Sequence, residues 1–453
     1  MSTAAATSYL DQTLGGVGHT SVPLLLGGVV GRDEAIADAG LSRDEWRAAR
    51  RRWAADADRL TRAMTWVDPY VDHAEVTISI KDTVDVAGMP TGLGHLTHRH
   101  YPPTSADVVR QVQALGLAVV GKAYATELNI GPPEVAVNPA FPDLSPGGSS
   151  TGSAVSVAAG ISDFALSTDV LGSTRWPATN CGVAGLRTTW DPTRLTGVLP
   201  VSPSQDALGF MARTVADLGW LWQRFQPSPP IDRPLVIATV ANASTCLPMI
   251  ADALRRAADT VRDLGFTVTE IELPERSWAV RELAWELCAA DVAEVVAEVE
   301  SRMGLSISAP ARASLRPPVD PARRAELMAA RTAFAAELPV LLDQAGVDVL
   351  LLPVSPTPPK RVVERAGKPT LPKPGDSDYT DRVGYTPVAS FAGLPALVQP
   401  VRISADHGPL GVQLVGRPAA ESVLLHVGAR LESALGVHRE VADLVARTLV
   451  GQS

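Results

Sequence analysis

Two serine-containing segments hold the residues that could act as nucleophiles. Ser173 lies in ALSTDVLGSTRWPA, which spans residues 165–178, and Ser149 and Ser150 lie in a glycine-rich segment. The base that usually activates a serine is histidine, yet no histidine occurs within fifty residues downstream of Ser173. A serine nucleophile in this chain therefore needs a different group to accept its proton.

Two lysines at expected strand ends are candidates for that base. Lys81 follows a segment, AEVTISIKD, in which apolar and polar residues alternate as in a half-buried strand. Burial disfavours an ammonium group, so it lowers the pKa of such a lysine and makes the lysine usable as a base. Ser–Lys arrangements replace Ser–His in some enzymes, and an intervening hydroxyl could relay the proton. Lys122, in VVGKAYATEL, competes for the role, and a lysine that reaches solvent is the alternative for both.

The glycine-rich segment SPGGSSTGSAVSVAAG, residues 145–160, does not have the pattern of a nucleotide site. A phosphate-binding P-loop needs a lysine directly before serine or threonine, and the dinucleotide fingerprint needs GxGxxG; both are absent here. The segment instead predicts a loop of unusual backbone geometry that presents Ser149 and Ser150. The helix of small residues that follows would let this loop pack tightly on the core.

The elements expected around these residues alternate between strands and helices, which indicates an α/β fold. Expected strands cover residues 74–82, 117–121, 234–240, 267–273, 347–353 and 408–416. Expected helices cover residues 104–116, 213–225, 249–264 and 421–436, and residues 277–346 are mostly helical. The stretch 353–374, rich in proline and lysine, is expected to be a surface loop.

The first 70 residues are expected to form a polar start and one or two helices. Ser42 and Glu45 have the spacing of a capping box, ahead of an apolar stripe that begins at Trp46. The arginines within that helix are expected to form a solvated face; they are Arg47, Arg50, Arg51 and Arg52. The N-terminus lacks the pattern of a signal peptide, and no apolar run is long enough to predict a membrane span.

The composition argues against several partners. The chain has 49 acidic residues against 40 Lys and Arg, without a clustered basic face, so we expect no nucleic-acid partner. Its three cysteines are widely spaced, which favours a reduced, cytoplasmic protein. His95, His98 and His100 have spacing that could hold Zn²⁺, but no cysteine or obvious acidic partner accompanies them. A surface loop or the rim of a substrate entrance is the favoured interpretation, and no metal is expected.

Several motifs in order resemble the amidase signature family. GGSSTGSAVSVAAG and STDVLGSTRWPATNCGVAGLR are similar to the two halves of the family signature, and IKDTVDVAGMPTGLG is similar to its lysine motif. Ser173 follows Ser149 by 24 residues, as in the family, and Lys81 precedes Ser149 by 68. The resemblance covers roughly residues 74–230 and 345–436.

The resemblance implies a fold and a domain organisation. The expected fold is one compact α/β unit, with a central mixed, twisted β-sheet covered by helices on both faces. Residues 71–440 would form the catalytic domain, and residues 1–70 a helical segment packed on it. The variable, substrate-side part of the domain would cover about 235–345.

The resemblance also implies roles for individual residues. Ser173 would be the nucleophile that forms an acyl-enzyme, Ser149 a bridging serine preceded by a cis peptide bond, and Lys81 the neutral base. An oxyanion hole would be formed by the backbone N–H groups of Val170, Leu171, Gly172 and Ser173. Supporting positions would be Ser150, Asp169 and Arg175, although Arg175 could instead hold substrate. Neither a metal nor a cofactor is implied.

The chain departs from the family pattern in three places near the serines. Leu171 and Thr151 replace glycines, and Trp176 replaces a smaller aliphatic residue. Leucine adopts positive φ only at a cost, so the loop could differ there or the Leu171 side chain could narrow the pocket. Trp176 is either a packing residue or a pocket wall. Other candidates for apolar walls are Trp285, Tyr379 and Tyr385.

The expected activity is hydrolysis of a linear amide C–N bond of a small molecule, releasing ammonia or an amine. Two alternatives stay open: a glutamine-hydrolysing subunit that supplies ammonia to a partner, and a scaffold without turnover. The family's glutamine-binding aspartate has no clear counterpart, because a gap-free match places Val383 there and Asp381 lies two positions away. A homodimer is an open alternative for the oligomeric state.

Overall fold

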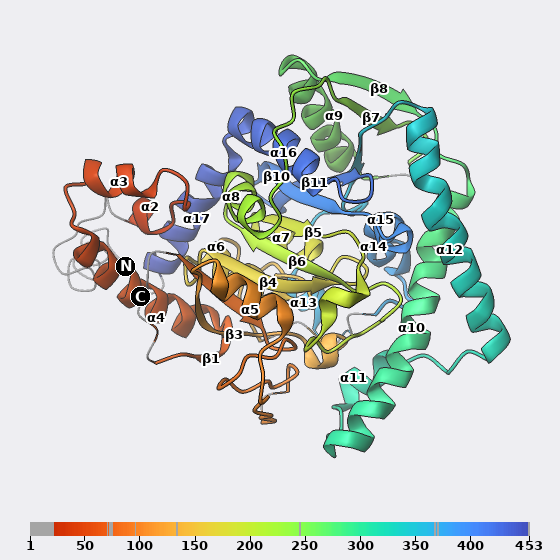
Figure 1. Cartoon of the computed structure of the whole chain (residues 1–453), viewed down its shortest axis with the longest axis horizontal. Helices are drawn as coiled ribbons and strands as arrows, with labels where there is room; N and C mark the ends of the chain where they lie inside the picture. The colour runs from red at the N-terminus through yellow and green to blue at the C-terminus, as the bar shows by residue number, and fades with distance from the viewer. Residues whose placement is uncertain are drawn as a thin grey trace.

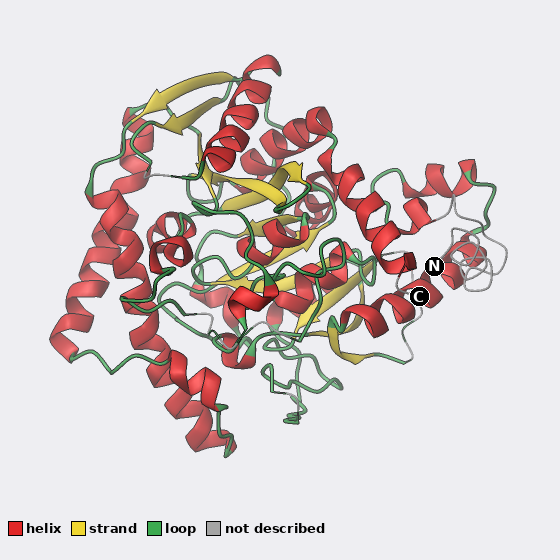
Figure 2. Ribbon diagram, turned by 180° about the vertical axis from the view of Figure 1, so that it is seen from behind, coloured by secondary structure: helices red, strands yellow, loops and turns green. Residues whose placement is uncertain are grey.

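The computed structural model describes residues 22–69, 71, 76–95, 97–132, 135–243, 246–366, 368 and 371–451. In these ranges eleven strands form one mixed sheet, in the order β1-β3-β2-β4-β6-β5-β10-β11-β9-β7-β8. Helices lie in front of the sheet and behind it, as opposite views show (Figure 1 and Figure 2). The predicted α/β class, with a mixed sheet covered on both faces, is confirmed.

The strands are β1 (Met64–Val67), β2 (Thr77–Lys81), β3 (Ala118–Ala123), β4 (Phe164–Asp169), β5 (Ala184–Arg187), β6 (Ala207–Ala212), β7 (Val236–Val240), β8 (Thr267–Ile271), β9 (Val349–Pro353), β10 (Ala396–Ser404) and β11 (Gly408–Gly416). Strand β2 runs parallel to both β3 and β4. The carboxyl ends of parallel strands meet at one edge of a sheet, where α/β proteins place their sites. This edge brings together Lys81, which ends β2, and Asp169, which ends β4.

Alternation along the strands sorts their side chains between two cores. Ile78 and Phe164 pack in a core with the helices α5 (Asp107–Ala114), α8 (Val215–Phe225), α9 (Pro248–Asp263) and α16 (Glu421–Leu435). Ala165 faces the opposite core, which is closed by α6 (Thr151–Ala158), α7 (Arg175–Cys181) and α17 (Val437–Gly451). Lys81 differs from Ile78 by an odd number of residues, so its side chain lies on the α6 side.

A third core lies at the end of the sheet opposite the N-terminal helices (Figure 1). The long helices α10 (Arg276–Met303) and α12 (Pro321–Gln344) pack there against each other and against α15 (Thr386–Ala392). The mostly helical character predicted for residues 277–346 is confirmed. The remaining short helices are η2 (Glu127–Asn129), η3 (Pro192–Leu195), α11 (Ala309–Ser314), α13 (Val362–Arg365) and α14 (Tyr379–Val383).

The described N-terminal helices are α2 (Val22–Leu25), α3 (Arg32–Asp38) and α4 (Arg43–Thr61). The capping box of Ser42 and Glu45 is present at the start of α4, as predicted. The prediction that all the α4 arginines are solvated is wrong for Arg50, which is fully buried and lies 2.7 Å from the Asp163 carboxylate. The cause is tertiary, because the Arg50 side chain also donates to Thr77 Oγ1 at the start of β2, at 2.9 Å. Residues 1–21 of the predicted N-terminal segment lie outside the described ranges.

Candidate active site

Lys81 is fully buried at the carboxyl end of β2. Its ammonium nitrogen, Nζ, lies 2.9 Å from Ser149 Oγ and 2.8 Å from Thr168 Oγ1. Burial lowers the pKa of Lys81 to about 7, against the opposing effects of the Asp206 and Asp169 carboxylates. Near neutral pH, therefore, much of this lysine carries a lone pair that can accept a proton.

The glycine-rich segment turns sharply before it enters α6. Gly147 has a φ of 78°, and the peptide bond between Gly148 and Ser149 is cis, as the family resemblance implied. The Ser149 carbonyl accepts a hydrogen bond from the Thr126 N–H at 3.0 Å. Thr151, which replaces a family glycine, begins α6 and donates from Oγ1 to the Gly147 carbonyl at 2.8 Å. These contacts hold Ser149 beside Lys81.

The small residues of α6 are explained by close contact with neighbouring backbone. A Cβ atom added to Gly152 would lie 2.2 Å from the Ala63 carbonyl oxygen and 2.4 Å from the Tyr124 nitrogen. Backbone cannot give way at such distances, so only glycine fits there. The sequence prediction of a tightly packed small-residue helix is confirmed.

Ser150 links the two serine segments. Its N–H donates to the Ser173 carbonyl at 3.3 Å, and its Oγ donates to the Thr168 carbonyl at 3.2 Å. Ser173 itself lines the cavity described below. The residues predicted from sequence for nucleophile, bridge and base therefore lie in one region, at the carboxyl ends of β2 and β4.

The loop after β4 is organised by the Asp169 carboxylate. This carboxylate accepts hydrogen bonds from the N–H groups of Gly172 at 2.9 Å and Thr174 at 3.1 Å. The Gly172 N–H is thus engaged, which differs from the prediction that it belongs to the oxyanion hole. A buried carboxylate without hydrogen-bond donors costs free energy, and the loop backbone supplies some of the donors that Asp169 needs. Among the described residues, none accepts a hydrogen bond from the N–H of Leu171 or Ser173.

Arg175 binds the loop to the rest of the fold. All of its guanidinium donors have protein acceptors: Asp169, the Thr386 carbonyl, Gln413 and Ser390. Burial raises the pKa of Asp169, but Arg175 and Arg187 lower it more, so this pKa lies well below its ordinary value. The geometry favours the bracing interpretation of Arg175 over contact with substrate, since no donor is left to offer.

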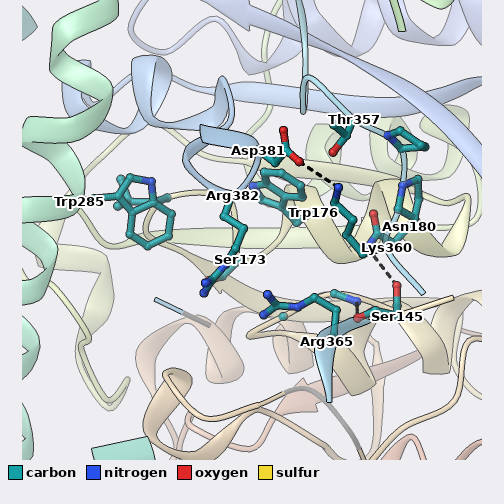
Figure 3. Close-up of a pocket in the computed structure, with 16 residues that line it drawn as sticks. Ser145, Ser173, Trp176, Asn180, Trp285, Thr357, Lys360, Arg365, Asp381 and Arg382 are labelled. Carbon is teal, nitrogen blue, oxygen red and sulfur yellow. Dashed lines mark hydrogen bonds and ion pairs between the residues drawn. The ribbon is translucent and has the colours of Figure 1, made fainter. Parts of the chain in front are cut away.

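A cavity of about 740 Å³, counting the open space at its mouth, lies above the serines (Figure 3). Its lining comes from four parts of the chain, namely the serine loops, α7, α10 and the segment between β9 and α15. The lining residues are Ser145, Gly147, Gly148, Leu171, Gly172, Ser173, Trp176, Asn180, Trp285, Thr357, Pro358, Pro359, Lys360, Arg365, Asp381 and Arg382. This volume suits a small organic substrate.

The aromatic residues expected to line the site divide into two groups. Trp176 and Trp285 line the cavity, and Trp176 is also packed, since its indole N–H donates to Thr386 Oγ1 at 3.1 Å. Tyr385 is wrong as a wall residue because it is fully buried, with its hydroxyl 3.3 Å from Cys246 Sγ. Tyr379 is half-buried against the third core and is not part of the lining.

Leu171 accommodates the loop without left-handed backbone. The left-handed φ falls on Gly172 instead, at 119°, where a Cβ would meet the Trp176 ring at 2.3 Å. The Leu171 side chain is almost fully buried at the cavity wall. The Leu171 side chain therefore forms part of the cavity wall, and its backbone does not need the left-handed conformation.

Two residues near Lys81 were missed by sequence reasoning. Thr168 accepts a hydrogen bond from Lys81. Its position directly before Asp169, in a strand parallel to β2, could have indicated this contact from the sequence. Asp206 is buried with one carboxylate oxygen bonded to the N–H groups of Val201 and Ser202 at 2.7 and 2.9 Å. Burial raises the pKa of Asp206. No sequence pattern distinguished it, because its proximity to Lys81 depends on how β6 joins the sheet.

The competing lysine, Lys122, lies elsewhere. Its Nζ donates to the Val84 carbonyl and to Thr91 Oγ1, and contacts none of the serines discussed above. Among the described residues no group of His, Cys, Asp and Glu side chains is arranged to hold a metal ion, so His95, His98 and His100 do not converge. None of the described helices combines the length and apolar character that crossing a bilayer requires.

The sequence pattern of the Amidase family matches residues 50–425. The chain belongs to this family. The match spans Lys81, both serine segments and most of the sheet. This amidase is a hydrolase that acts on carbon–nitrogen bonds in amides.

Relatives of this amidase include AmiB2, a candidate amidase of Mycobacterium tuberculosis, which is 32% identical over 79% of this chain and 81% of that protein. A glutamyl-tRNA(Gln) amidotransferase subunit of Chloroflexus aurantiacus is 29% identical, over 82% of this chain and 85% of that protein. A crystal structure described as an amidase superposes with a TM-score of 0.72 at 25% identity, covering 96% of this chain and 100% of that one.

Proposed function

We propose that this amidase cleaves a linear amide through an acyl-enzyme on Ser173, with Ser149 and Lys81 as its proton relay. The observation that carries the proposal is the 2.9 Å contact between Lys81 Nζ and Ser149 Oγ in a fully buried place. A lysine with a pKa lowered to about 7 can be neutral at neutral pH, as a base must be. The bond from the Ser150 N–H to the Ser173 carbonyl supports the relay by keeping the two serine segments adjacent.

In the first half-reaction, Ser173 Oγ attacks the amide carbonyl carbon. Its proton passes to Ser149 Oγ as the Ser149 proton passes to Lys81 Nζ, and the carbonyl oxygen becomes an oxyanion. The N–H groups of Leu171 and Ser173 are the donors we propose for that oxyanion. Collapse of the intermediate breaks the C–N bond, and the proton returns through Ser149 to the leaving nitrogen. Ammonia or an amine departs, leaving the acyl group on Ser173.

In the second half-reaction, water attacks the acyl carbon and gives its proton to the same relay. The Ser173–acyl bond breaks, Ser173 recovers its proton, and a carboxylic acid is released. Asp169 and Arg175 support both steps indirectly, because they fix the loop that carries Ser173. The reaction balances without a cofactor. We also propose that residues 71–440 act as one catalytic unit in the cytoplasm, with the N-terminal helices packed on it through the Arg50–Asp163 pair.

A fluorophosphonate probe tests the nucleophile directly. We expect one covalent adduct on Ser173, found by peptide mass spectrometry, and its loss in Ser173→Ala together with hydrolysis of a panel of aliphatic and aromatic amides. Folded protein that hydrolyses amides but carries no adduct on Ser173 would show that another residue is the nucleophile. Folded protein that neither labels nor hydrolyses any amide would favour the scaffold alternative.

Hydrolysis of glutamine for a partner protein is the second candidate function. Its support is the 29% identity to the glutamyl-tRNA(Gln) amidotransferase subunit of Chloroflexus aurantiacus. Against it, Val383 is buried in an apolar core, and Asp381 at the cavity is paired with Lys360 at 2.9 Å. A glutaminase assay on the chain alone separates the two. We expect glutamine to be a poorer substrate than the best member of the amide panel.

A further inference from the structure

Trp176, where the family pattern has a smaller aliphatic residue, packs against two glycines. A Cβ atom added to Gly172 would lie 2.3 Å from Cδ1 of the indole, and one added to Gly384 would lie 2.6 Å from Cζ2. Both glycines have a positive φ, of 119° and 60°, which other residues rarely adopt. The backbone beside both rings of the indole therefore leaves room for a side chain of this size.

The polar atom of this ring is engaged inside the protein. Trp176 Nε1 donates to Thr386 Oγ1 at 3.1 Å, and Thr386 Oγ1 donates to the Leu171 carbonyl at 2.6 Å. The Trp176 backbone N–H donates to the Gly172 carbonyl at 2.7 Å. These bonds fix the ring relative to the loop that carries Ser173. Because the side chain is only half-buried and lines the cavity, the ring presents carbon atoms to a ligand.

Several other side chains of the lining are apolar. Trp285 lines the cavity from α10, and its Nε1 donates to the Val383 carbonyl at 3.4 Å. Figure 3 shows the indole rings of Trp285 and Trp176 among the residues around Ser173. The apolar lining also includes Leu171, Pro358 and Pro359. Through its prolines the stretch 353–374, predicted to be a surface loop, forms part of the cavity wall.

The charged side chains of the lining already have partners in the protein. The ion pairs are those of Lys360 with Asp381 at 2.9 Å, and of Arg382 with Asp376 at 2.9 Å and Asp378 at 3.7 Å. Arg365, which also lines the cavity, donates to the Lys368 carbonyl at 3.5 Å. A charged ligand would compete with these contacts and lose hydration, whereas an uncharged ligand would not. The lining therefore favours an uncharged, apolar group.

We propose that the substrate is an amide that carries an uncharged aromatic ring, and that Trp176 selects it by contact between the two rings. The proposal rests on the proposed function, since it places the amide carbonyl at Ser173. Aromatic rings attract each other in offset-stacked or edge-to-face arrangements beyond what the buried area alone gives. A saturated ring of the same size buries a similar apolar area but lacks this attraction. The preference for a flat ring over a saturated one is therefore the property that Trp176 determines.

Matched substrates test the preference. Phenylacetamide is compared with cyclohexylacetamide, where the ring is on the acyl side, and N-benzylacetamide with N-(cyclohexylmethyl)acetamide, where it is on the amine side. A methylene group separates each ring from the amide, so the ring changes the intrinsic reactivity little. We expect kcat/KM to be about threefold to tenfold higher for the aromatic member of at least one pair, which identifies the side that contacts Trp176. Equal or lower values for the aromatic members of both pairs would overturn the proposal.

The pair that shows the preference also tests the requirement for an uncharged ring. A carboxylate is added at the para position of its aromatic member. We expect kcat/KM to fall, because the carboxylate loses hydration at a wall whose charged groups are already engaged. A carboxylated amide that is hydrolysed as fast as the neutral one, or faster, would overturn this part of the proposal.

The Trp176→Leu variant measures the contribution of the indole. We expect the ratio of kcat/KM between the aromatic and the saturated member to fall to about one, and Trp176→Phe to retain part of it. Trp220→Leu is the matched control, because Trp220 is also half-buried but stacks on Phe164 with ring centroids 5.9 Å apart. An unchanged ratio in folded Trp176→Leu would overturn the proposal. The wild-type ratio tests the proposal even where Trp176→Leu does not fold.

Failure of this proposal is distinguishable from failure of the proposed function. If the saturated amides are hydrolysed and Ser173 is labelled while the aromatic amides gain nothing, only the aromatic site is wrong. If none of the four amides is hydrolysed and Ser173 is not labelled, the proposed function itself fails, and the aromatic site with it.

Discussion

Lys81 Nζ and Ser149 Oγ lie 2.9 Å apart, although 68 residues separate them in the chain. Charged Lys81 donates in this contact, whereas neutral Lys81 can accept the Ser149 proton through its lone pair. The same pair of atoms therefore serves as an inactive hydrogen bond or as a proton relay, and the protonation state of Lys81 decides which.

The pH dependence should report the titration of Lys81. Because burial lowers its pKa to about 7, the neutral base is lost as the pH falls through that value. We expect kcat/KM to rise with pH through about 7 and then to level off, when measured from about pH 5 to 9. A profile that is flat down to about pH 5 would contradict a lysine base.

Replacing Lys81 by methionine should remove the base while keeping most of the side-chain volume. We expect kcat to fall about 10²- to 10⁴-fold in folded protein, as judged by circular dichroism and steady-state kinetics. Lys122→Met is the matched control, since Lys122 is also buried and, among the residues that the structure describes, bonds to Val84 and Thr91. Per folded molecule this control should retain far more activity. If Lys81→Met kept more than about a tenth of wild-type kcat, the relay would be wrong.

Asp206 should raise the pKa of Lys81 through its charge. We expect Asp206→Asn to lower the pKa of Lys81, so that the acidic limb of kcat/KM moves to lower pH. Asp217→Asn is the control, because Asp217 is a buried carboxylate that bonds instead to the Val29 and Val30 N–H groups at 2.7 and 2.9 Å. If the acidic limb of the kcat/KM profile lies at the same pH in Asp206→Asn as in the wild type, Asp206 is uncharged when Lys81 titrates.

Asp163 should contribute strongly to stability. Its buried carboxylate pairs with Arg32, Arg50 and Arg213. Burial raises the pKa of Asp163, but these arginines lower it more, so it lies well below the ordinary value. The stabilisation is therefore present above about pH 4 and is lost only as the pH falls through the lowered pKa.

Asp163→Asn would leave three buried guanidinium groups without a counter-charge. We expect the free energy of unfolding at pH 7 to fall by about 3–5 kcal/mol, measured by urea denaturation. Asp44→Asn is the control, since Asp44 pairs with Arg47 at an exposed position and should change stability little. Equal small effects in both variants would show that the buried cluster is not a stabilising unit.

The sequence by itself determined the fold class and the identities of the serines and the lysine. Alternating polarity placed Lys81 at a strand end, and the order and spacing of the motifs around Ser149 and Ser173 indicated one family. These features are local or depend on residue order, so they can be read without knowing which elements touch.

Only the tertiary structure decided which groups meet. Thr168 contacts Lys81 because β2 and β4 are neighbours in the sheet, and the charge of Asp206 acts on Lys81 because β6 lies beside β4. The side chain of Arg50 points from α4 to Asp163. Part of the cavity lining comes from a segment that lies about 190 residues after Ser173 in the chain. Burial and partner choice depend on packing between distant elements, and periodicity along the chain carries no information about that packing.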